Sequence, residues 1–175
     1  MLYDNALINS IGEGLDCKCV ATVLVVDDNE FNLLPLTLIL QATYKIHCLK
    51  ALNGAVAVEL FRRDRQKRCC NVHIQLVLMD LVMPVLDGLS ATVQIMDILR
   101  EERVIKGCFD TRADKADPAK MAAEMGVSVV AITAYIDQPT VDKIFDCGMV
   151  EALQKPINSV LMEQIITKYY QQPTG

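Results

Sequence analysis

The most constraining feature of the sequence is a run of apolar residues, Leu76 to Met79, that ends in a single carboxylate, Asp80. A short run without polar positions is typical of a strand buried on both faces, as in a parallel sheet. Pro84 and the pair Asp87–Gly88 then predict a tight loop. Ligands of open α/β sheets bind outside the carboxyl ends of the strands, so Asp80 is expected at a functional position. The alternative is an ordinary solvated aspartate in a loop.

A second apolar run, Val23 to Val26, is followed directly by two acidic residues, Asp27 and Asp28. Adjacent carboxylates repel each other and are costly to remove from water. The start of a helix accounts for one acidic residue at this place, whereas a divalent cation accounts for both. Mg²⁺ binds one or two carboxylates together with water and phosphate oxygens. If the two strands are neighbours in the sheet, Asp27, Asp28 and Asp80 form an acidic pocket.

Two further predicted strands end in polar groups. The apolar run Val127 to Ile132 ends at Thr133, and a weaker run, Val150 to Leu153, is followed by Lys155. A hydroxyl, an ammonium group, a metal ion and a single aspartate are the parts of a site that accepts a phosphoryl group. In such a site Asp80 is the nucleophile, while the metal and Lys155 neutralise the oxygens of the transferred group.

Four motifs, each at a predicted strand end, resemble the receiver domain of two-component response regulators. In chain order they are VLVVDDNEFN, LVLMDLVMPVLDG, AITA and LQKPI, and the resemblance covers roughly residues 22–170. They are most similar to the receivers of hybrid histidine kinases. The resemblance implies a cytoplasmic signalling domain that takes a phosphoryl group from a phosphohistidine. The expected partner is a histidine kinase or a histidine phosphotransfer protein.

The resemblance also implies roles for individual residues. Asp80 corresponds to the phosphorylated aspartate, and Thr133 and Lys155 correspond to the residues that contact the phosphoryl group. The bond between Lys155 and Pro156 corresponds to one that is usually cis, which an X–Pro bond adopts at modest cost. Phosphorylation is expected to move Thr133 and Lys155 and so to switch the conformation of the domain.

The expected cofactor is Mg²⁺. By the same resemblance, Asp28 corresponds to the acid that binds the metal directly, and Asp27 to the acid that usually acts through a water molecule. Asp80 itself and the backbone carbonyl of Val82 complete the protein ligands. These four positions form the predicted metal site.

The order of predicted elements indicates the fold class. Five strands alternate with five helices, which predicts a parallel sheet covered on both faces, in the flavodoxin-like order 2-1-3-4-5. Residues 21–170 are expected to form the receiver domain, with residues 1–20 as an extension or linker and residues 171–175 as a tail. An insertion near residues 104–126 departs from the family pattern. Asp117–Pro118 predicts a short extra helix within it.

Composition excludes several other classes. The net charge of −5 argues against a nucleic-acid surface. The seven cysteines lack the spacing of a zinc site and fit reduced thiols in a cytosolic protein. No run has the length of a membrane span and no secretory signal is evident, so we expect a cytoplasmic domain, or the cytoplasmic part of a membrane-anchored parent, without direct membrane contact.

Two alternative functions compete with the phosphoacceptor. An Mg²⁺-dependent phosphohydrolase with an aspartate nucleophile needs a second acid nearby for acid–base catalysis, but Val82 stands two residues after Asp80. A receiver-like binding module that is not phosphorylated would not need the complete residue set. We therefore expect a signalling domain that catalyses only its own phosphorylation and slow dephosphorylation. By the same resemblance, Val82 and Tyr135 correspond to the residues that line the path of the hydrolysing water, and we expect them to shield the aspartyl phosphate and make it long-lived.

Overall fold

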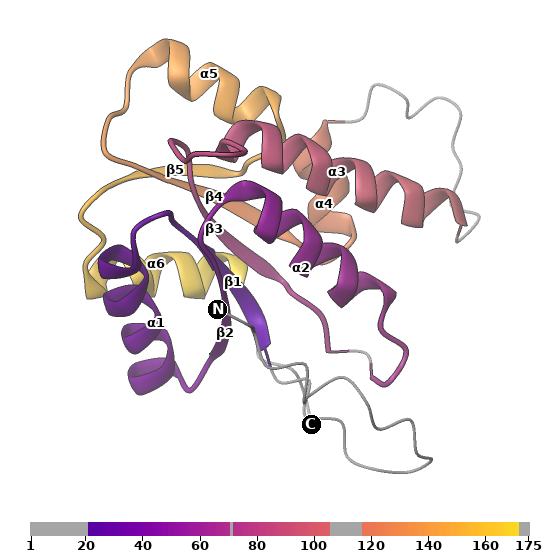
Figure 1. Ribbon diagram of the computed structural model, residues 1–175, viewed down its shortest axis with the longest axis horizontal. Coiled ribbons are helices and arrows are strands. Elements are labelled where there is room, and N and C mark those ends of the chain that lie inside the picture. Colours follow the sequence, from indigo (N-terminus) through magenta and orange to yellow (C-terminus); the bar gives the residue numbers. More distant parts are fainter. Residues whose placement is uncertain (1–20, 71, 106–116, 172–175) are drawn as a thin grey trace.

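The computed structural model describes residues 21–70, 72–105 and 117–171. At its centre is a parallel sheet of five strands in the order β2-β1-β3-β4-β5, as the sequence predicts (Figure 1). The strands are β1 (Ala21–Val26), β2 (His47–Ala51), β3 (Leu76–Asp80), β4 (Ser128–Thr133) and β5 (Glu151–Gln154). Residues 1–20 and 172–175, which include the predicted extension and most of the predicted tail, lie outside the described residues.

Helices cover both faces of the sheet (Figure 1). They are α1 (Glu30–Tyr44), α2 (Gly54–Gln66), α3 (Gly88–Ile105), α4 (Pro118–Glu124), α5 (Gln138–Asp146) and α6 (Ser159–Tyr169). Successive residues of a strand point to opposite faces. In β3, Leu76 and Leu78 accordingly pack with the helices α1 and α6, whereas Val77 and Met79 pack with α2 and α3. Both faces of the central strand are therefore buried, which explains its continuous apolar sequence.

The strand register brings the carboxyl ends of the strands to one edge. Val26 of β1 lies beside Met79 of β3, and Asp80 lies beside Ile132 of β4. Thr133 in turn lies beside Gln154, the last residue of β5. The polar residues that end or follow these strands therefore meet at the same edge, the place where open α/β sheets bind ligands.

The predicted extra helix is present as α4. The side chain of Asp117 accepts a hydrogen bond from the backbone N–H of Ala119 and caps the helix. Met121 and Ala122 are buried in the core beside α3 and β4, so the helix is part of the folded domain. Residues 106–116, which belong to the insertion predicted near residues 104–126, lie outside the described residues.

In the part of the chain that the structure describes, every helix is too short or too polar to cross a membrane.

Candidate functional site

An acidic cluster forms at the carboxyl edge of the sheet. The carboxylates of Asp27, Asp28 and Asp80 place one oxygen each within 4.8 Å of one another. Asp27 follows β1 directly and Asp80 ends β3, so the pairing of these two strands creates the cluster. Asp27 and Asp80 are buried, with 2% and 6% exposure, while Asp28 is exposed. The structure thus brings together the three acids that the sequence placed in one pocket.

Lys155 joins the cluster from the far side of β4. Its Nζ lies 2.7 Å from Oδ2 of Asp27 and 2.9 Å from Oδ2 of Asp80. Its backbone N–H donates to the carbonyl of Thr133, and its peptide bond to Pro156 is cis. One ammonium group therefore holds two buried carboxylates, and the third carboxylate faces solvent.

The electrostatics of the cluster follow from burial and from this ion pairing. Burial raises the pKa of Asp80 above its ordinary value, and the nearby charge of Asp27 acts in the same direction, while Lys155 opposes both. Burial by itself would lower the pKa of Lys155, but its hydrogen bonds to Asp27 and Asp80 raise it overall. Lys155 is therefore a cation at neutral pH and compensates part of the negative charge.

Two groups that the sequence did not reveal complete the contacts of Asp27. Its Oδ1 accepts hydrogen bonds from the backbone N–H of Asn29 (2.9 Å) and from Nδ2 of Asn32 (3.0 Å). The side chain of Asn29 caps α1 by accepting from the N–H of Phe31, as its position before an apolar helix predicts. The sequence signal for Asn32 is its place in the first turn of α1, four residues after Asp28.

Thr133 and Val82, two further residues of the predicted site, differ in burial. Thr133 is buried at the end of β4, and its hydroxyl donates to the backbone carbonyl of Tyr135 at 3.2 Å. Val82 stands in the loop after β3 and is 80% exposed, and Tyr135 is 67% exposed. The side chains of Val82 and Tyr135 thus lie mainly in solvent, which is not the packed position that the shielding hypothesis assumes.

The loop after β3 is fixed by the start of α2. The N–H of Gly54 donates to the carbonyl of Leu86 at 3.1 Å. A Cβ at position 54 would lie only 2.5 Å from that carbonyl oxygen. Within the loop, Val85 has a φ of 71°, in the left-handed region that side chains with a branched Cβ rarely adopt. Close backbone packing therefore sets the path of the chain just after Asp80.

The donor set of the cluster fits a hard divalent cation. Carboxylate oxygens are the ligands that Mg²⁺ and Ca²⁺ prefer, and Asp27, Asp28 and Asp80 supply three of them. The charges agree with this, since among the described residues the cluster has three carboxylates and Lys155 pairs with two of them. The cluster can therefore hold a metal ion.

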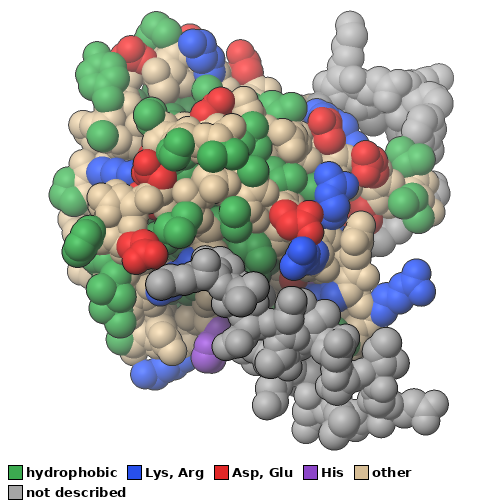
Figure 2. Space-filling view, in the orientation of Figure 1, with side chains coloured by type: hydrophobic (Ala, Val, Ile, Leu, Met, Phe, Trp, Pro, Cys, Tyr) green, Lys and Arg blue, Asp and Glu red, His purple; other side chains and the backbone are tan. Residues whose placement is uncertain are grey.

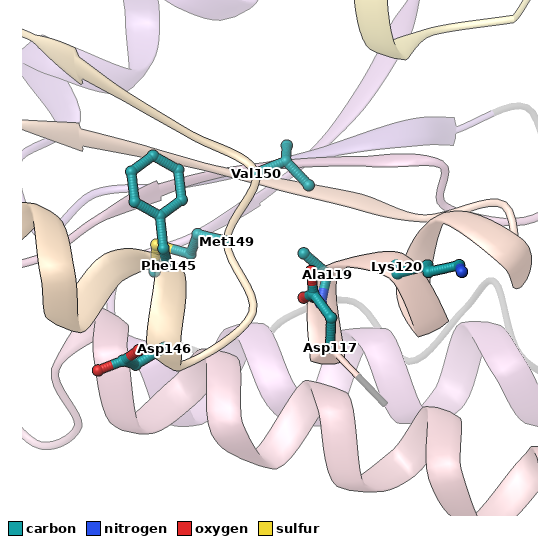
Figure 3. A pocket seen from close by; sticks show the side chains of 7 residues that line it. All are labelled: Asp117, Ala119, Lys120, Phe145, Asp146, Met149 and Val150. Carbon is teal, nitrogen blue, oxygen red and sulfur yellow. The ribbon is translucent and has the colours of Figure 1, made fainter. Parts of the chain in front are cut away.

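A separate hollow lies beside the extra helix (Figure 3). Figure 3 shows the start of α4 on one side of it and Phe145 and Met149 on the other. Val150, which also lines it, directly precedes β5 and lies at the amino end of that strand. The hollow is therefore at the opposite end of the strands from Asp80 and is not part of the acidic cluster.

Comparison with known proteins gives a consistent picture. No family model matches the chain. The chain is 29% identical over 157 residues to the response regulator SSK1 of Arthrobotrys oligospora, covering 84% of this chain and 14% of that protein. It is 28% identical to the probable histidine kinase 4 of Oryza sativa subsp. japonica, again over 84% of this chain and 14% of the relative. The chain thus spans about a seventh of the length of these two curated relatives.

Solved structures agree in fold and, in one case, in sequence. The chain superimposes with a TM-score of 0.62 and 28% identity on a chain of the co-crystal structure of the Saccharomyces cerevisiae phosphotransfer protein Ypd1 and the receiver domain of Ssk1, covering 85% of this chain and 88% of that one. It superimposes with a TM-score of 0.61 and 21% identity on a chain of the CheX–CheY complex of Borrelia burgdorferi, covering 84% of this chain and 87% of that one. At that identity the second match shows the fold alone.

The sheet order, together with the carboxylates and lysine at its carboxyl edge, defines the CheY-like class of α/β domain. The chain is similar in sequence and in fold to the receiver domains of two-component response regulators, as the order of its motifs predicted. Its relatives include both response regulators and histidine kinases. The chain is therefore similar to response regulators as well as to the histidine kinases that the motifs suggested.

Proposed function

We propose that the domain accepts a phosphoryl group on Asp80 from a phosphohistidine of a partner protein. The observation that carries the proposal is the position of Asp80, a buried carboxylate at the end of β3 that pairs with Lys155 and lies beside the carboxylates of Asp27 and Asp28. A carboxylate oxygen of Asp80 attacks the phosphorus in line. The phosphorus–nitrogen bond to histidine breaks, an acyl phosphate forms, and the imidazole leaves.

Several residues of the chain would support this transfer. Lys155 is close enough to Asp80 to neutralise an oxygen of the incoming group. Asp27, Asp28, Asp80 and the backbone carbonyl of Val82 would hold Mg²⁺, which when bound supplies further neutralising charge for phosphoryl oxygens. Burial of Asp27 and Asp80 lowers the local dielectric, and this strengthens each of these interactions.

The same residues suggest how phosphorylation changes the domain. Lys155 now binds two carboxylates, and a phosphoryl group on Asp80 would offer it a stronger partner than the Asp27 carboxylate. The hydroxyl of Thr133 now donates to the carbonyl of Tyr135, and turning it toward the phosphoryl group would break that hydrogen bond. The loop between β4 and α5 would then move, so the signal would spread to the surface of α5.

The surface next to the site supports a protein partner. Phe31, Leu34 and Leu38 on α1 are 86%, 51% and 53% exposed, and their helical spacing places them on one face. Figure 2 shows hydrophobic side chains on the part of the surface where Figure 1 places α1. We propose that a histidine phosphotransfer protein or a histidine kinase docks there, since Ssk1 of Saccharomyces cerevisiae was crystallised with such a protein.

The competing hydrolase is less well supported. A hydrolase needs a group that activates water beside the nucleophile, and the nearest candidate position holds Val82, an exposed apolar side chain. The domain is therefore a signalling phosphoacceptor that catalyses only its own phosphorylation and slow dephosphorylation. We place it on the cytoplasmic side of the cell. We assign this role to residues 21–170, with residues 104–126 as an insertion, residues 1–20 as an extension or linker and residues 171–175 as a tail.

The proposal is tested by phosphorylation in solution. The chain is incubated with acetyl phosphate and Mg²⁺, and the adduct is mapped by mass spectrometry. We expect one phosphoryl group, on Asp80, which is absent in Asp80→Asn and strongly reduced by a metal chelator. Undiminished labelling of Asp80→Asn would contradict the proposal.

The partner is tested separately. Phosphorylated Ypd1 is mixed with the chain, and transfer of the phosphoryl group is followed with time. Phe31→Ala should slow this transfer while labelling by acetyl phosphate, which needs no docking surface, keeps its rate. Equal effects of Phe31→Ala on both reactions would show that α1 is not the docking surface.

A further inference from the structure

Asp27 is held from both sides. Its Oδ2 accepts a hydrogen bond from Nζ of Lys155 at 2.7 Å, and its Oδ1 accepts from the N–H of Asn29 and from Nδ2 of Asn32. With 2% exposure the carboxylate has little contact with water. Rotation of the Asp27 side chain would break hydrogen bonds to a charged group, which are stronger than neutral ones.

Among the described residues, Asn32 supplies the one side-chain hydrogen bond to Asp27 that comes from a helix. It lies in the first turn of α1, where its backbone N–H donates to the carbonyl of Asn29 at 2.9 Å. Its side chain is partly buried and reaches back to the end of β1. The amide is neutral, so it can orient the carboxylate without competing with Lys155 for it or adding charge to the cluster.

We propose that Asn32 is a positioning residue for the phosphoacceptor site. It fixes the Asp27 carboxylate in one orientation. In that orientation Oδ1 accepts a hydrogen bond from Asn32 of α1, and Oδ2 accepts one from Lys155, which also pairs with Asp80. The inference rests on the proposed function, because its consequence is that Asn32 prepares the cluster for a divalent cation. Residues behind a metal ligand commonly change metal affinity by 10- to 100-fold when they are replaced.

A purely structural role for Asn32 makes a different prediction. The cap of α1 is the side chain of Asn29, which accepts from the N–H of Phe31, so the Asn32 amide is not the cap. If Asn32 only stabilised the helix, removing another side-chain hydrogen bond within α1 would have the same effect on the site. Thr37 offers this comparison, since its buried hydroxyl donates to the carbonyl of Leu33 within the same helix.

The first experiment is calorimetric titration of the chain with Mg²⁺. Asn32→Ala should raise the dissociation constant about tenfold or more. The control Thr37→Ala should lower the melting temperature but leave the Mg²⁺ affinity within about twofold, because additive effects are expected for sites without shared partners. Unchanged affinity in Asn32→Ala, or an equal loss in Thr37→Ala, would overturn the inference.

The second experiment needs no metal and so separates this inference from the proposed function. Side-chain amide signals are recorded by NMR in the metal-free protein. The Asn32 amide protons should exchange slowly with water, and Asp27→Ala should abolish this protection. If the amide exchanges freely in the parent chain, Asn32 does not hold Asp27. If the parent chain binds no Mg²⁺ while the amide is protected, the metal site fails and the positioning contact stands.

Discussion

A methyl group on the α-carbon of Gly88 would lie 2.1 Å from the backbone carbonyl oxygen of Asp80. The N–H of Gly88 also donates to the carbonyl of Leu81 at 3.0 Å. The first residue of α3 is thus packed directly on the backbone of Asp80, the proposed phosphoacceptor. Only a glycine fits there without moving that backbone, which links the stability of the loop to the geometry of the site.

Gly88→Ala should therefore destabilise the domain and reduce phosphorylation of Asp80. Forcing a side chain into packed backbone costs about 1–3 kcal/mol or more. Gly126→Ala is the comparison, since a Cβ there meets no atom within 4 Å and only its φ of 72° opposes the change. Denaturant unfolding and acetyl phosphate labelling measure the two effects. Equal labelling rates in the two variants would show that the contact with Asp80 does not matter.

Asp28→Ala should weaken Mg²⁺ binding and leave the fold intact. Asp28 is the exposed member of the cluster, whereas the buried Asp27 and Asp80 form ion pairs with Lys155. Its removal takes away a metal ligand and some repulsion, so the metal-free free energy of unfolding should change by less than about 0.5 kcal/mol. Titration with Mg²⁺ and thermal melting in a chelator separate the two quantities. A parent-like Mg²⁺ affinity would refute the assignment of Asp28 as a ligand.

Lys155→Met should destabilise the metal-free protein, because Asp27 and Asp80 would be left buried without their cation. Removing one partner of a buried ion pair costs about 3–5 kcal/mol, and the 22% exposure of the Lys155 side chain reduces this to about 2 kcal/mol. Asp27→Asn in the same chain should recover part of the loss, since it removes one of the two unpaired charges.

The loss in Lys155→Met should depend on pH. Burial already raises the pKa of Asp80, and losing Lys155, which lowers it, should raise that pKa further. The folded state then binds more protons than the unfolded state at any pH between the unfolded and the folded pKa of this carboxyl group. Stability of the variant relative to the parent should therefore rise as pH falls from 7 toward 4 without metal. A difference in melting temperature that is constant over this range would contradict the prediction.

The lifetime of the proposed aspartyl phosphate tests the roles that the sequence suggested for Val82 and Tyr135. Tyr135 is 67% exposed and touches Thr133 through its carbonyl, so Tyr135→Ala should leave the decay rate nearly unchanged. Val82→Asn should accelerate decay several-fold, because an amide can orient the attacking water where valine cannot. Phosphate loss is followed after removal of the donor. Faster decay in Tyr135→Ala alone would restore the shielding role that the sequence suggested.

Local sequence patterns were enough to predict the sheet and the place of the site. The buried residues Leu76 to Met79 of β3 are all apolar, and residues at the carboxyl ends of neighbouring parallel strands must meet. Asp27, Asp28 and Asp80 could therefore be predicted as one cluster from local patterns alone. The short helix α4 could be predicted for the same reason, since its cap and its proline are local signals.

The contacts that hold the site together could not be predicted from the sequence, because they depend on the tertiary structure. Lys155 reaches Asp27 across 128 positions of the chain, and the spacing of residues carries no information on which carboxylates it binds. The contact of Asn32 with Asp27 and the exposure of Tyr135 depend on the angle at which α1 and the loop after β4 leave the sheet. Those angles follow from packing of whole elements against the two cores, and packing is decided by shape among many residues at once rather than by any local pattern.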